Sequence, residues 1–188
     1  MTDRKFPIGP FAPQENYSEE ELANLISVIE SAPADYRNLV TDLSETDLNK
    51  TYREGSWTVK QLIHHVADIH LLHFFRMKQA LTDPDYKDVT LINMDGWAKT
   101  PEASLMPIDV SLTILESIGT RYVYLAKTLT PEQFEIAYFH PVRKIWLNQR
   151  HALAMSAWHV THHFAHINLA LGKIDLMRCL RLRENTSF

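Results

Sequence analysis

The sequence predicts an all-α protein folded as a four-helix bundle. Four segments of about twenty residues repeat apolar side chains with the helical period. Glycine is scarce, with five in 188 residues, and the alternating apolar runs typical of strands are few. The length suits one domain over residues 1–188, and the 45% apolar content suits a protein with a buried core.

The first helix follows an extended N-terminal arm. Residues 1–16 contain three prolines and one glycine, which predicts the arm. The helix begins near Ser18, whose hydroxyl can cap the run EEELANLISVIESA. Its inner face carries apolar residues at helical spacing, namely Leu22, Leu25, Ile26 and Ile29. Pro33 should kink or interrupt this helix before it continues through ADYRNLVTDLS.

The second helix begins at TVKQ and runs to about Leu81. Thr58 and Gln61 have the spacing of a capping box at its start. Residues 83–108 contain three prolines and no helical period, so they predict a long connection. Because such a connection can cross the whole length of a helix, the second and third helices can run parallel.

The third helix spans residues 109–128, and its inner face is predicted to carry Leu112, Leu115, Ile118, Tyr122 and Leu125. Residues 130–134 resemble a short capped turn. The fourth helix runs from Asn148 to Gly172, a residue suited to end it, and a tail follows over 173–188. The fourth helix should therefore be antiparallel to the second.

The composition narrows the classes of function. The net charge of −4 argues against partners such as nucleic acid or acidic membranes. One cysteine, Cys179, allows no internal disulfide, which fits a reducing compartment. The N-terminus has no signal-peptide pattern, and no apolar stretch of about 18 residues could span a membrane. We therefore expect a cytoplasmic enzyme or binding protein.

Histidines concentrate in two segments, LIHHVADIHLLH (62–73) and SAWHVTHHFAH (156–166), which hold eight of the ten. His159 and His163 lie four residues apart, so on a helix they share one face and can bind one divalent cation. No glutamate stands between them as it does in zinc peptidases, which argues against peptidase chemistry but not against a metal.

His65 is the best candidate for a third ligand. It lies about 10 Å from the start of the second helix, and His163 lies about 13 Å from the end of the fourth, so the levels match in an antiparallel pair. His64 is rotated by about 100° and should face elsewhere. Three imidazoles leave an open position, as catalytic sites do. His70, His73, His162 and His166 could be supporting, interface or core groups, and the sequence does not assign their roles.

Several motifs, taken together, resemble the YfiT branch of the DinB-like superfamily. These are FPIGPF, YREGSWTVKQLIHHVADIHLLHFFRMK (52–78), FHP (139–141) and AWHVTHHFAHI (157–167), and they cover nearly the whole chain in order. The chain departs from the family pattern at Ser56, where relatives have glycine, and at His73, where they have asparagine. Neither departure removes a ligand, although both could alter the rim of the pocket and the choice of substrate.

The resemblance implies a four-helix bundle that binds one divalent metal per chain, zinc or nickel, through His65, His159 and His163. Members of the family are described as metal-dependent hydrolases. The best-understood relatives resemble S-transferases that join a low-molecular-weight thiol, such as bacillithiol, to an electrophile. The resemblance also implies a homodimer.

We therefore expect a metal-dependent thiol S-transferase. The metal would lower the pKa of the thiol. Arg76, which lies on the same face of the second helix as His65, could bind an anionic group of that thiol. An interhelical ion pair is an equal interpretation of Arg76.

Two alternatives remain. One is a hydrolase that uses metal-bound water, for which Asp68 and Glu54 are the carboxylates nearby in sequence. The other is a binding protein for a metal or a small molecule, without turnover.

Overall fold

Four long helices form the body of the protein: α1 (Glu19–Val40), α3 (Val59–Thr82), α6 (Asp109–Lys127) and α8 (Gln149–Ala170). The computed structural model describes residues 4–173, so the predicted tail over 173–188, including Cys179, lies outside them apart from Lys173. The short elements are α2 (Glu45–Leu48), α4 (Met94–Trp97), α5 (Pro101–Leu105), α7 (Pro131–Phe134), β1 (Ala137–His140) and β2 (Ile145–Asn148). The prediction of an all-α four-helix bundle is confirmed.

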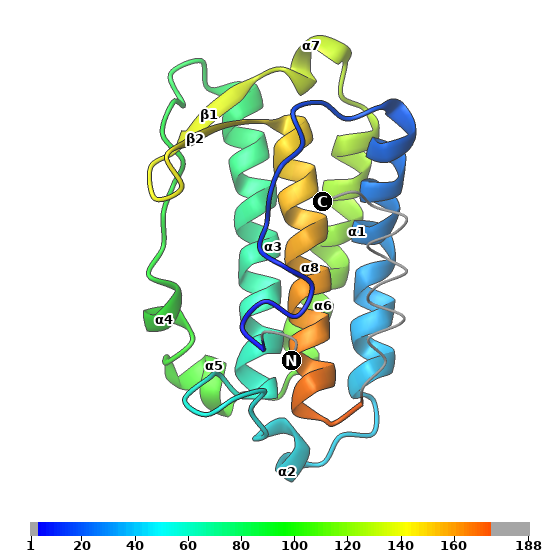
Figure 1. The fold of residues 1–188 in the computed structure, drawn as a ribbon, viewed down its shortest axis with the longest axis vertical. Helices are drawn as coiled ribbons and strands as arrows, with labels where there is room; N and C mark the ends of the chain where they lie inside the picture. The colour runs from blue at the N-terminus through cyan, green and yellow to red at the C-terminus, as the bar shows by residue number, and fades with distance from the viewer. Residues whose placement is uncertain (1–3, 174–188) are drawn as a thin grey trace.

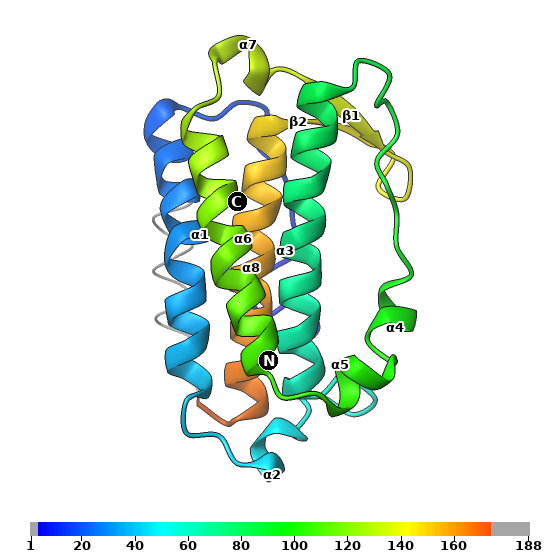
Figure 2. The ribbon, with the colours of Figure 1, turned by 180° about the vertical axis from the view of Figure 1, so that it is seen from behind.

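The direction of the helices follows from the long connection between α3 and α6. In Figure 1, α3 and α6 run one way, and α1 and α8 run the other way. Residues 83–108, which include α4 and α5, return along the outside of the bundle (Figure 2). Each of α1 and α3 packs against both α6 and α8. Parallel α3 and α6, and antiparallel α3 and α8, agree with the sequence-based expectation.

Side-chain caps fix where three of the four long helices begin, α6 being the exception. Ser18, Thr58 and Asn148 each accept a hydrogen bond from the backbone N–H three residues later. In each case the side chain of that later residue also bonds the backbone of the cap, which completes a capping box. The starts of α1 and α3 were therefore readable from short polar patterns in the sequence.

Helix α1 continues through Pro33, so the expected interruption does not occur. Proline removes one backbone donor from a helix interior, at a cost of about 3 kcal/mol relative to alanine. The neighbouring residues Ile29, Ala32 and Tyr36 are almost fully buried. Their packing against the bundle holds the helix together across the missing hydrogen bond.

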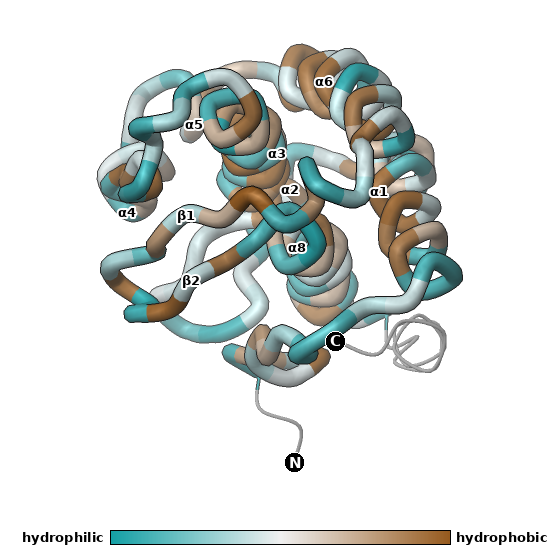
Figure 3. Tube along the Cα trace, turned by 90° about the horizontal axis from the view of Figure 1, so that it is seen from above, coloured by the Kyte–Doolittle hydropathy of each residue, from teal (hydrophilic) through white to brown (hydrophobic). Residues whose placement is uncertain are grey.

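A short antiparallel hairpin, β1 with β2, is an element that the sequence did not predict. It pairs with the long connection, since Val89 donates to the carbonyl of Phe139 and Phe139 donates to that of Lys87. Seen along the bundle (Figure 3), the hairpin, α4 and α5 lie on the side of α3 and α8, away from α1 and α6. On this side of the molecule, the outer layer therefore consists of the hairpin, the short helices α4 and α5 and the loops between them.

Helix α8 is buried on nearly all sides because the N-terminal arm covers its outer face. Every residue from 152 to 163 is buried. Three side chains of α8 donate to carbonyls of the arm: His151 Nε2 to Gln14 (2.9 Å), Trp158 Nε1 to Gly9 (3.1 Å) and His166 Nε2 to Lys5 (3.3 Å). Their order shows that the arm runs antiparallel to α8, as Figure 1 also shows.

Among residues 4–173, no helix is both long enough and apolar enough to cross a membrane.

Candidate metal centre

Three histidines converge between α3 and α8. His65 comes from α3, and His159 and His163 come from successive turns of α8. The Nε2 atoms of His65 and His159 are 3.1 Å apart. The ring of His163 lies 4.8 Å from that of His65 and 4.5 Å from that of His159, between ring centres. One ring nitrogen from each of the three lies within 4.8 Å of the others.

Burial keeps these imidazoles neutral. The pKa of His65 is lowered to about 4, first by burial and then by repulsion from His166. The pKa values of His159 and His163 are held well below the ordinary histidine value by the same two causes, burial and neighbouring histidines. A neutral imidazole has the lone pair that a metal requires, so no proton has to be displaced at pH 7 before an ion binds.

The spacing of the ring nitrogens of His65 and His159 fits a bound divalent cation. Two Zn–N bonds of 2.0–2.1 Å at the tetrahedral angle place their nitrogens about 3.3 Å apart. The 3.1 Å between Nε2 of His65 and Nε2 of His159 is close to that separation. Three imidazoles are the protein donors of an open site, in which a further position is left for water or substrate.

The three side chains line a cavity of about 350 Å³. That volume is within the range of pockets for small ligands. Aromatic and apolar side chains make much of its wall, namely Phe6, Tyr52, Trp57, Met94 and Trp158. Trp57 lies against His65, with ring centres 4.6 Å apart, and so limits the access of water to that side of the cluster.

The rim of the cavity carries more positive than negative charge. Its charged residues are Lys5, Arg53, Arg143 and Asp95. Each cation lies over an aromatic ring at 5.4–5.6 Å: Lys5 over Phe6, Arg53 over Tyr52 and Arg143 over Phe11. In residues 4–173, no ion pair joins Arg53 or Arg143 to a carboxylate. The entrance therefore favours an anionic ligand.

Sequence reasoning did not identify these rim residues. Arg143 is in the turn of the unpredicted hairpin, Asp95 is in the long connection, and Lys5 is in the arm. None belongs to a periodic segment. The motif FHP (139–141) lies next to Arg143, but it indicates neither the hairpin nor a charged group at the rim.

Arg76 is buried and faces the long connection. Its Nε and Nη2 atoms donate to the carbonyl of Thr90, at 3.1 and 2.6 Å. The alternative interpretation, an interhelical ion pair, has no counterpart among the described residues. Arg76 thus fixes the chain that walls the cavity, and its predicted contact with a thiol stays a prediction.

His64 faces away from the cluster, as its helical phase predicts. Its Nδ1 lies 2.7 Å from Ser111 Oγ, and its Nε2 lies 3.3 Å from the carbonyl oxygen of Met106. Asp68 and Glu54 do not line the cavity. The pKa of Asp68 is raised to about 6 by its burial and by the neighbouring Glu102, on the side of α5.

A second trio, His162, His163 and His166, lies beside the first and shares His163. The Nδ1 atoms of His163 and His166 are 3.3 Å apart. His166 also stacks on Tyr52, with ring centres 3.8 Å apart, and His162 stacks on Trp158 at 4.4 Å. These contacts extend the histidine cluster toward the N-terminal arm.

The two remaining histidines of α3 point into the bundle. His73 contacts Ser156 Oγ through Nδ1 at 3.0 Å, and Tyr122 contacts the same hydroxyl at 2.9 Å. His70 is 1% exposed, and neither of its ring nitrogens has a hydrogen-bond partner among the described residues. Burial lowers the pKa of His70 to about 4.

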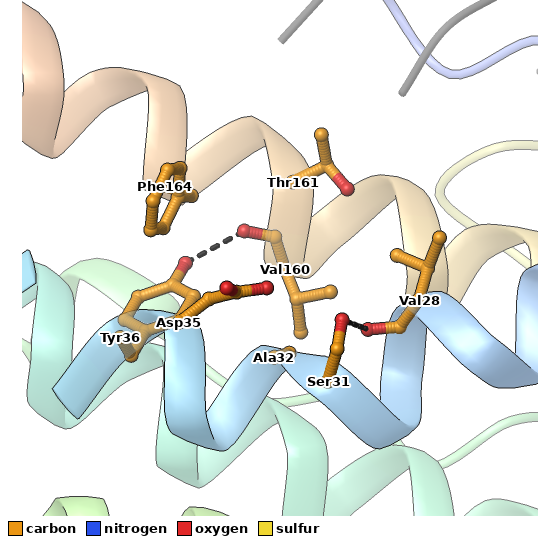
Figure 4. Close-up of a pocket in the computed structure, with 8 residues that line it drawn as sticks. All are labelled: Val28, Ser31, Ala32, Asp35, Tyr36, Val160, Thr161 and Phe164. Carbon is orange, nitrogen blue, oxygen red and sulfur yellow. Dashed lines mark hydrogen bonds between the residues drawn. The ribbon is translucent and has the colours of Figure 1, made fainter. Parts of the chain in front are cut away.

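A groove between α1 and α8 is a poor alternative site (Figure 4). Its volume is about 30 Å³, roughly that of one water molecule. Among the described residues that line it, Asp35 is the only ionisable side chain besides Tyr36, whose hydroxyl donates to the carbonyl of Val160 at 2.7 Å. No described residue of its lining offers an imidazole or thiol, so the histidine cavity is the better candidate for chemistry.

Comparisons with known proteins identify the family. The model of the DinB superfamily matches residues 29–167. A relative from Halalkalibacterium halodurans is 41% identical over 169 residues, which are 90% of this chain and 97% of that protein. One from Bacillus pumilus is 38% identical over 167 residues, or 89% of this chain and 94% of that protein. Both are named "Putative metal-dependent hydrolase".

Solved structures agree with the sequence comparisons. YfiT from Bacillus subtilis, described as a probable metal-dependent hydrolase with an unusual four-helix bundle topology, matches with a TM-score of 0.84 and 31% identity. The match covers 95% of this chain and 98% of that one. A mycothiol-dependent maleylpyruvate isomerase shares the fold, with a TM-score of 0.63 and 17% identity over 85% of this chain and 67% of that one. The chain belongs to the DinB superfamily and has the four-helix bundle topology of YfiT.

Proposed function

We propose that the protein is a metal-dependent S-transferase that conjugates a low-molecular-weight anionic thiol to an electrophile. His65, His159 and His163 would hold one divalent ion, zinc or nickel, per chain. The observation that carries the proposal is the combination of three converging neutral imidazoles with a cavity whose rim is mostly cationic. We also propose that the chain forms a homodimer and that it binds neither nucleic acid nor membranes.

A divalent ion in this position would act as a Lewis acid that lowers the pKa of a coordinated thiol or water. The protein contributes the rest. His65, His159 and His163 offer lone pairs without releasing protons, Trp57 and Tyr52 exclude water, and Arg53 and Arg143 bind the carboxylates of an anionic thiol. Arg76 remains a predicted anchor, although its two donors to Thr90 favour a role in holding the wall.

Hydrolysis is the second candidate because the relatives carry that name and because Asp95 lines the cavity. Asp95 is the only carboxylate among the described lining residues, and its side chain is exposed on α4. An exposed carboxylate at the rim is a weak candidate for a general base, which has to lie within hydrogen-bond reach of the attacking water. Nothing in the cavity favours hydrolysis over thiol transfer in the way that the cationic rim favours an anionic thiol.

A direct comparison of substrates tests the proposal. The purified, metal-loaded protein is assayed with several anionic thiols plus an epoxide or activated aryl halide, and separately with esters and amides. We expect conjugation and little hydrolysis. Hydrolysis that is suppressed by thiols would favour the hydrolase. Tight thiol or metal binding without any turnover would favour a binding protein.

The rim supplies a matched pair of variants. Arg143→Ala should raise KM for a dicarboxylate thiol by about fivefold, the effect expected for one exposed charge contact of about 1 kcal/mol, with kcat little changed. Arg37→Ala removes an exposed cation that pairs with Glu116 at 3.3 Å on the far side of the bundle, and it should leave KM unchanged. Equal effects of the two variants would contradict a specific role of the rim.

A further inference from the structure

The N-terminal arm reaches the histidine cluster through the backbone of Lys5 and of the neighbouring Arg4, both of which contact His166. His166 Nε2 lies 3.3 Å from the carbonyl oxygen of Lys5, and His166 Nδ1 lies 3.3 Å from Nδ1 of His163. His166 is buried, and its ring is held in place by stacking on Tyr52. Two imidazoles and a carbonyl thus form a continuous line from the arm to a candidate ligand.

The direction of each hydrogen bond in this line follows from the carbonyl. A carbonyl oxygen only accepts, so His166 must carry its proton on Nε2 to bond Lys5. A neutral imidazole has one N–H, so Nδ1 of His166 is then an acceptor. The proton between the two rings must therefore come from Nδ1 of His163. That leaves the lone pair of His163 on Nε2.

We propose that His166 is a positioning residue that, bonded to the carbonyl of Lys5, fixes the tautomer of His163 with its Nε2 lone pair available to the metal. Partners on the second nitrogen of a ligating histidine usually fix its tautomer and orientation, and a carbonyl or carboxylate commonly serves. Here the partner of His163 is a second histidine, His166, whose own tautomer is set by the carbonyl of Lys5 in the N-terminal arm. The arm is then part of the metal centre.

The candidate ligands His159 and His163 differ in whether Nδ1 has a hydrogen-bond partner. His159 Nδ1 is buried without a partner among the described residues, whereas His163 Nδ1 has His166. The support through the arm therefore acts on His163. The proposal rests on the metal-binding part of the proposed function, but it does not depend on whether the reaction is transfer or hydrolysis.

The same trio could instead bind a second ion, because His162, His163 and His166 also offer three nitrogens within 4.8 Å. His163 would then bridge two metals through both nitrogens. We favour the hydrogen-bonded line because His166 already bonds the arm and because His162 Nδ1 has no described partner that would orient it. Metal stoichiometry separates the two arrangements.

Asparagine and glutamine at position 166 give the sharpest test. The amide oxygen of asparagine can take the place of Nδ1 and accept from His163, whereas the longer glutamine reaches the place of Nε2 and leaves His163 Nδ1 without its acceptor. Both substitutions remove the stacked ring equally. The zinc dissociation constant is measured by chelator competition, with the thermal midpoint of the metal-free protein as a check on folding.

We expect His166→Gln to weaken zinc binding by about 10- to 100-fold, the usual cost of losing such a partner, and His166→Asn to weaken it much less. His162→Gln, the matched control, should leave both affinity and stoichiometry unchanged. Equal losses at position 166, or no loss with glutamine, would overturn the proposal. So would two zinc ions per chain with one lost in His162→Gln.

Imidazole ¹⁵N NMR of the unsubstituted protein provides a readout that does not depend on any variant. We expect His163 to be protonated on Nδ1 and His166 on Nε2, before and after zinc is added. The opposite tautomer of His166 in the metal-free protein would overturn the proposal. If the protein binds no metal at all, the proposed function fails, while the tautomers still test the line from Lys5 to His163.

Discussion

The direction of each ring nitrogen separates the candidate ligands from the other histidines. His65 and His159 point Nε2 at a common place, whereas His64 directs both nitrogens at Ser111 and Met106. His64 and His65 are adjacent on α3, but only His65 directs a ring nitrogen at the histidine cluster. Replacement of one of the three candidate ligands would leave two imidazoles, which hold an ion far more weakly than three.

His159→Ala should therefore remove the metal, and His64→Ala should not. Metal content per chain after gel filtration, measured by elemental analysis, checks both. We expect close to one equivalent in the unsubstituted protein and in His64→Ala, and almost none in His159→Ala. Loss of metal in His64→Ala together with its retention in His65→Ala would mean that His64, and not His65, is on the face of α3 that meets the metal.

The burial of His70 should make the folded protein less stable in acid. Burial lowers its pKa to about 4 in the folded state, compared with about 6.5 in the unfolded chain. Between those two values the unfolded chain binds more protons, so stability is complete above pH 6.5 and falls as the pH drops toward 4. In addition, both ring nitrogens are buried without a described partner, which costs about 1–3 kcal/mol at any pH.

His70→Leu should stabilise the metal-free protein by about 1–2 kcal/mol at pH 7, and by more at pH 5. Urea unfolding at the two pH values measures both differences. His151→Leu, which removes a ring that bonds the carbonyl of Gln14, is the contrasting control and should destabilise. A His70→Leu variant that is less stable at both pH values would show that this imidazole has a partner.

The sequence predicted which three histidines converge, but not the walls of the cavity around them. The i, i+4 spacing of His159 and His163 and the matched level of His65 suffice to bring the three together once α3 and α8 are antiparallel. Lys5, Arg53, Arg143 and Asp95 reach the rim through loops, whose course depends on tertiary contacts rather than on local periodicity. His166 was recognised in the sequence, but its bond to the arm could not be foreseen.

At the scale of elements, Pro33 shows that packing overrides local propensity. It lies inside α1, and its ring contributes to the interface with α6: a Cβ added to Gly119 would lie 3.5 Å from Pro33 Cγ and 3.4 Å from His70 Nε2. Gly119 therefore leaves room at a close contact between the two helices. The helix survives because its buried face is fixed by the rest of the bundle.

Pro33→Ala should stabilise the protein by about 1–2 kcal/mol. The substitution restores one backbone hydrogen bond, worth most of the roughly 3 kcal/mol penalty of an interior proline, and part of that gain is offset by a more flexible unfolded chain and a lost contact. Thermal unfolding of the metal-free protein measures the change. A fall in stability would mean that the contact at Gly119 outweighs the restored bond.

Helices and the hairpin differed in how well the sequence predicted them. The starts at Ser18 and Thr58 were readable because a cap is a local pattern that recurs within four residues. Strands β1 and β2 have four residues each, and their pairing is completed by Val89 of the long connection. Strands this short, joined by a turn (141–144) that contains neither glycine nor asparagine, leave little signal in the sequence.

The net charge of the whole molecule limits the kinds of ligand that it can attract. The net charge is −4, and the cations around the cavity are three residues from three separate segments. A cluster of this size suits a small anion rather than a phosphate backbone, which requires an extended basic surface.

The protein should therefore not bind duplex DNA, although its superfamily is named after DNA damage. Fluorescence anisotropy with a labelled duplex at low salt, up to protein concentrations of about 1 µM, should show no salt-dependent binding. Binding that weakens steeply as salt is added would contradict this expectation.

Coordination of a thiol in the three-histidine cavity is the central claim, and a cobalt-substituted protein tests it most directly. A free thiol with a pKa of about 8.5 is mostly protonated at pH 7, so its coordination as thiolate releases a proton. We predict a sulfur-to-cobalt charge-transfer band on adding an anionic thiol, none with the matching alcohol, none with His163→Ala, and faster conjugation of an electrophile at the same thiol concentrations. A band that accompanies only the suppression of ester or amide hydrolysis, or no band with any thiol, would contradict the account.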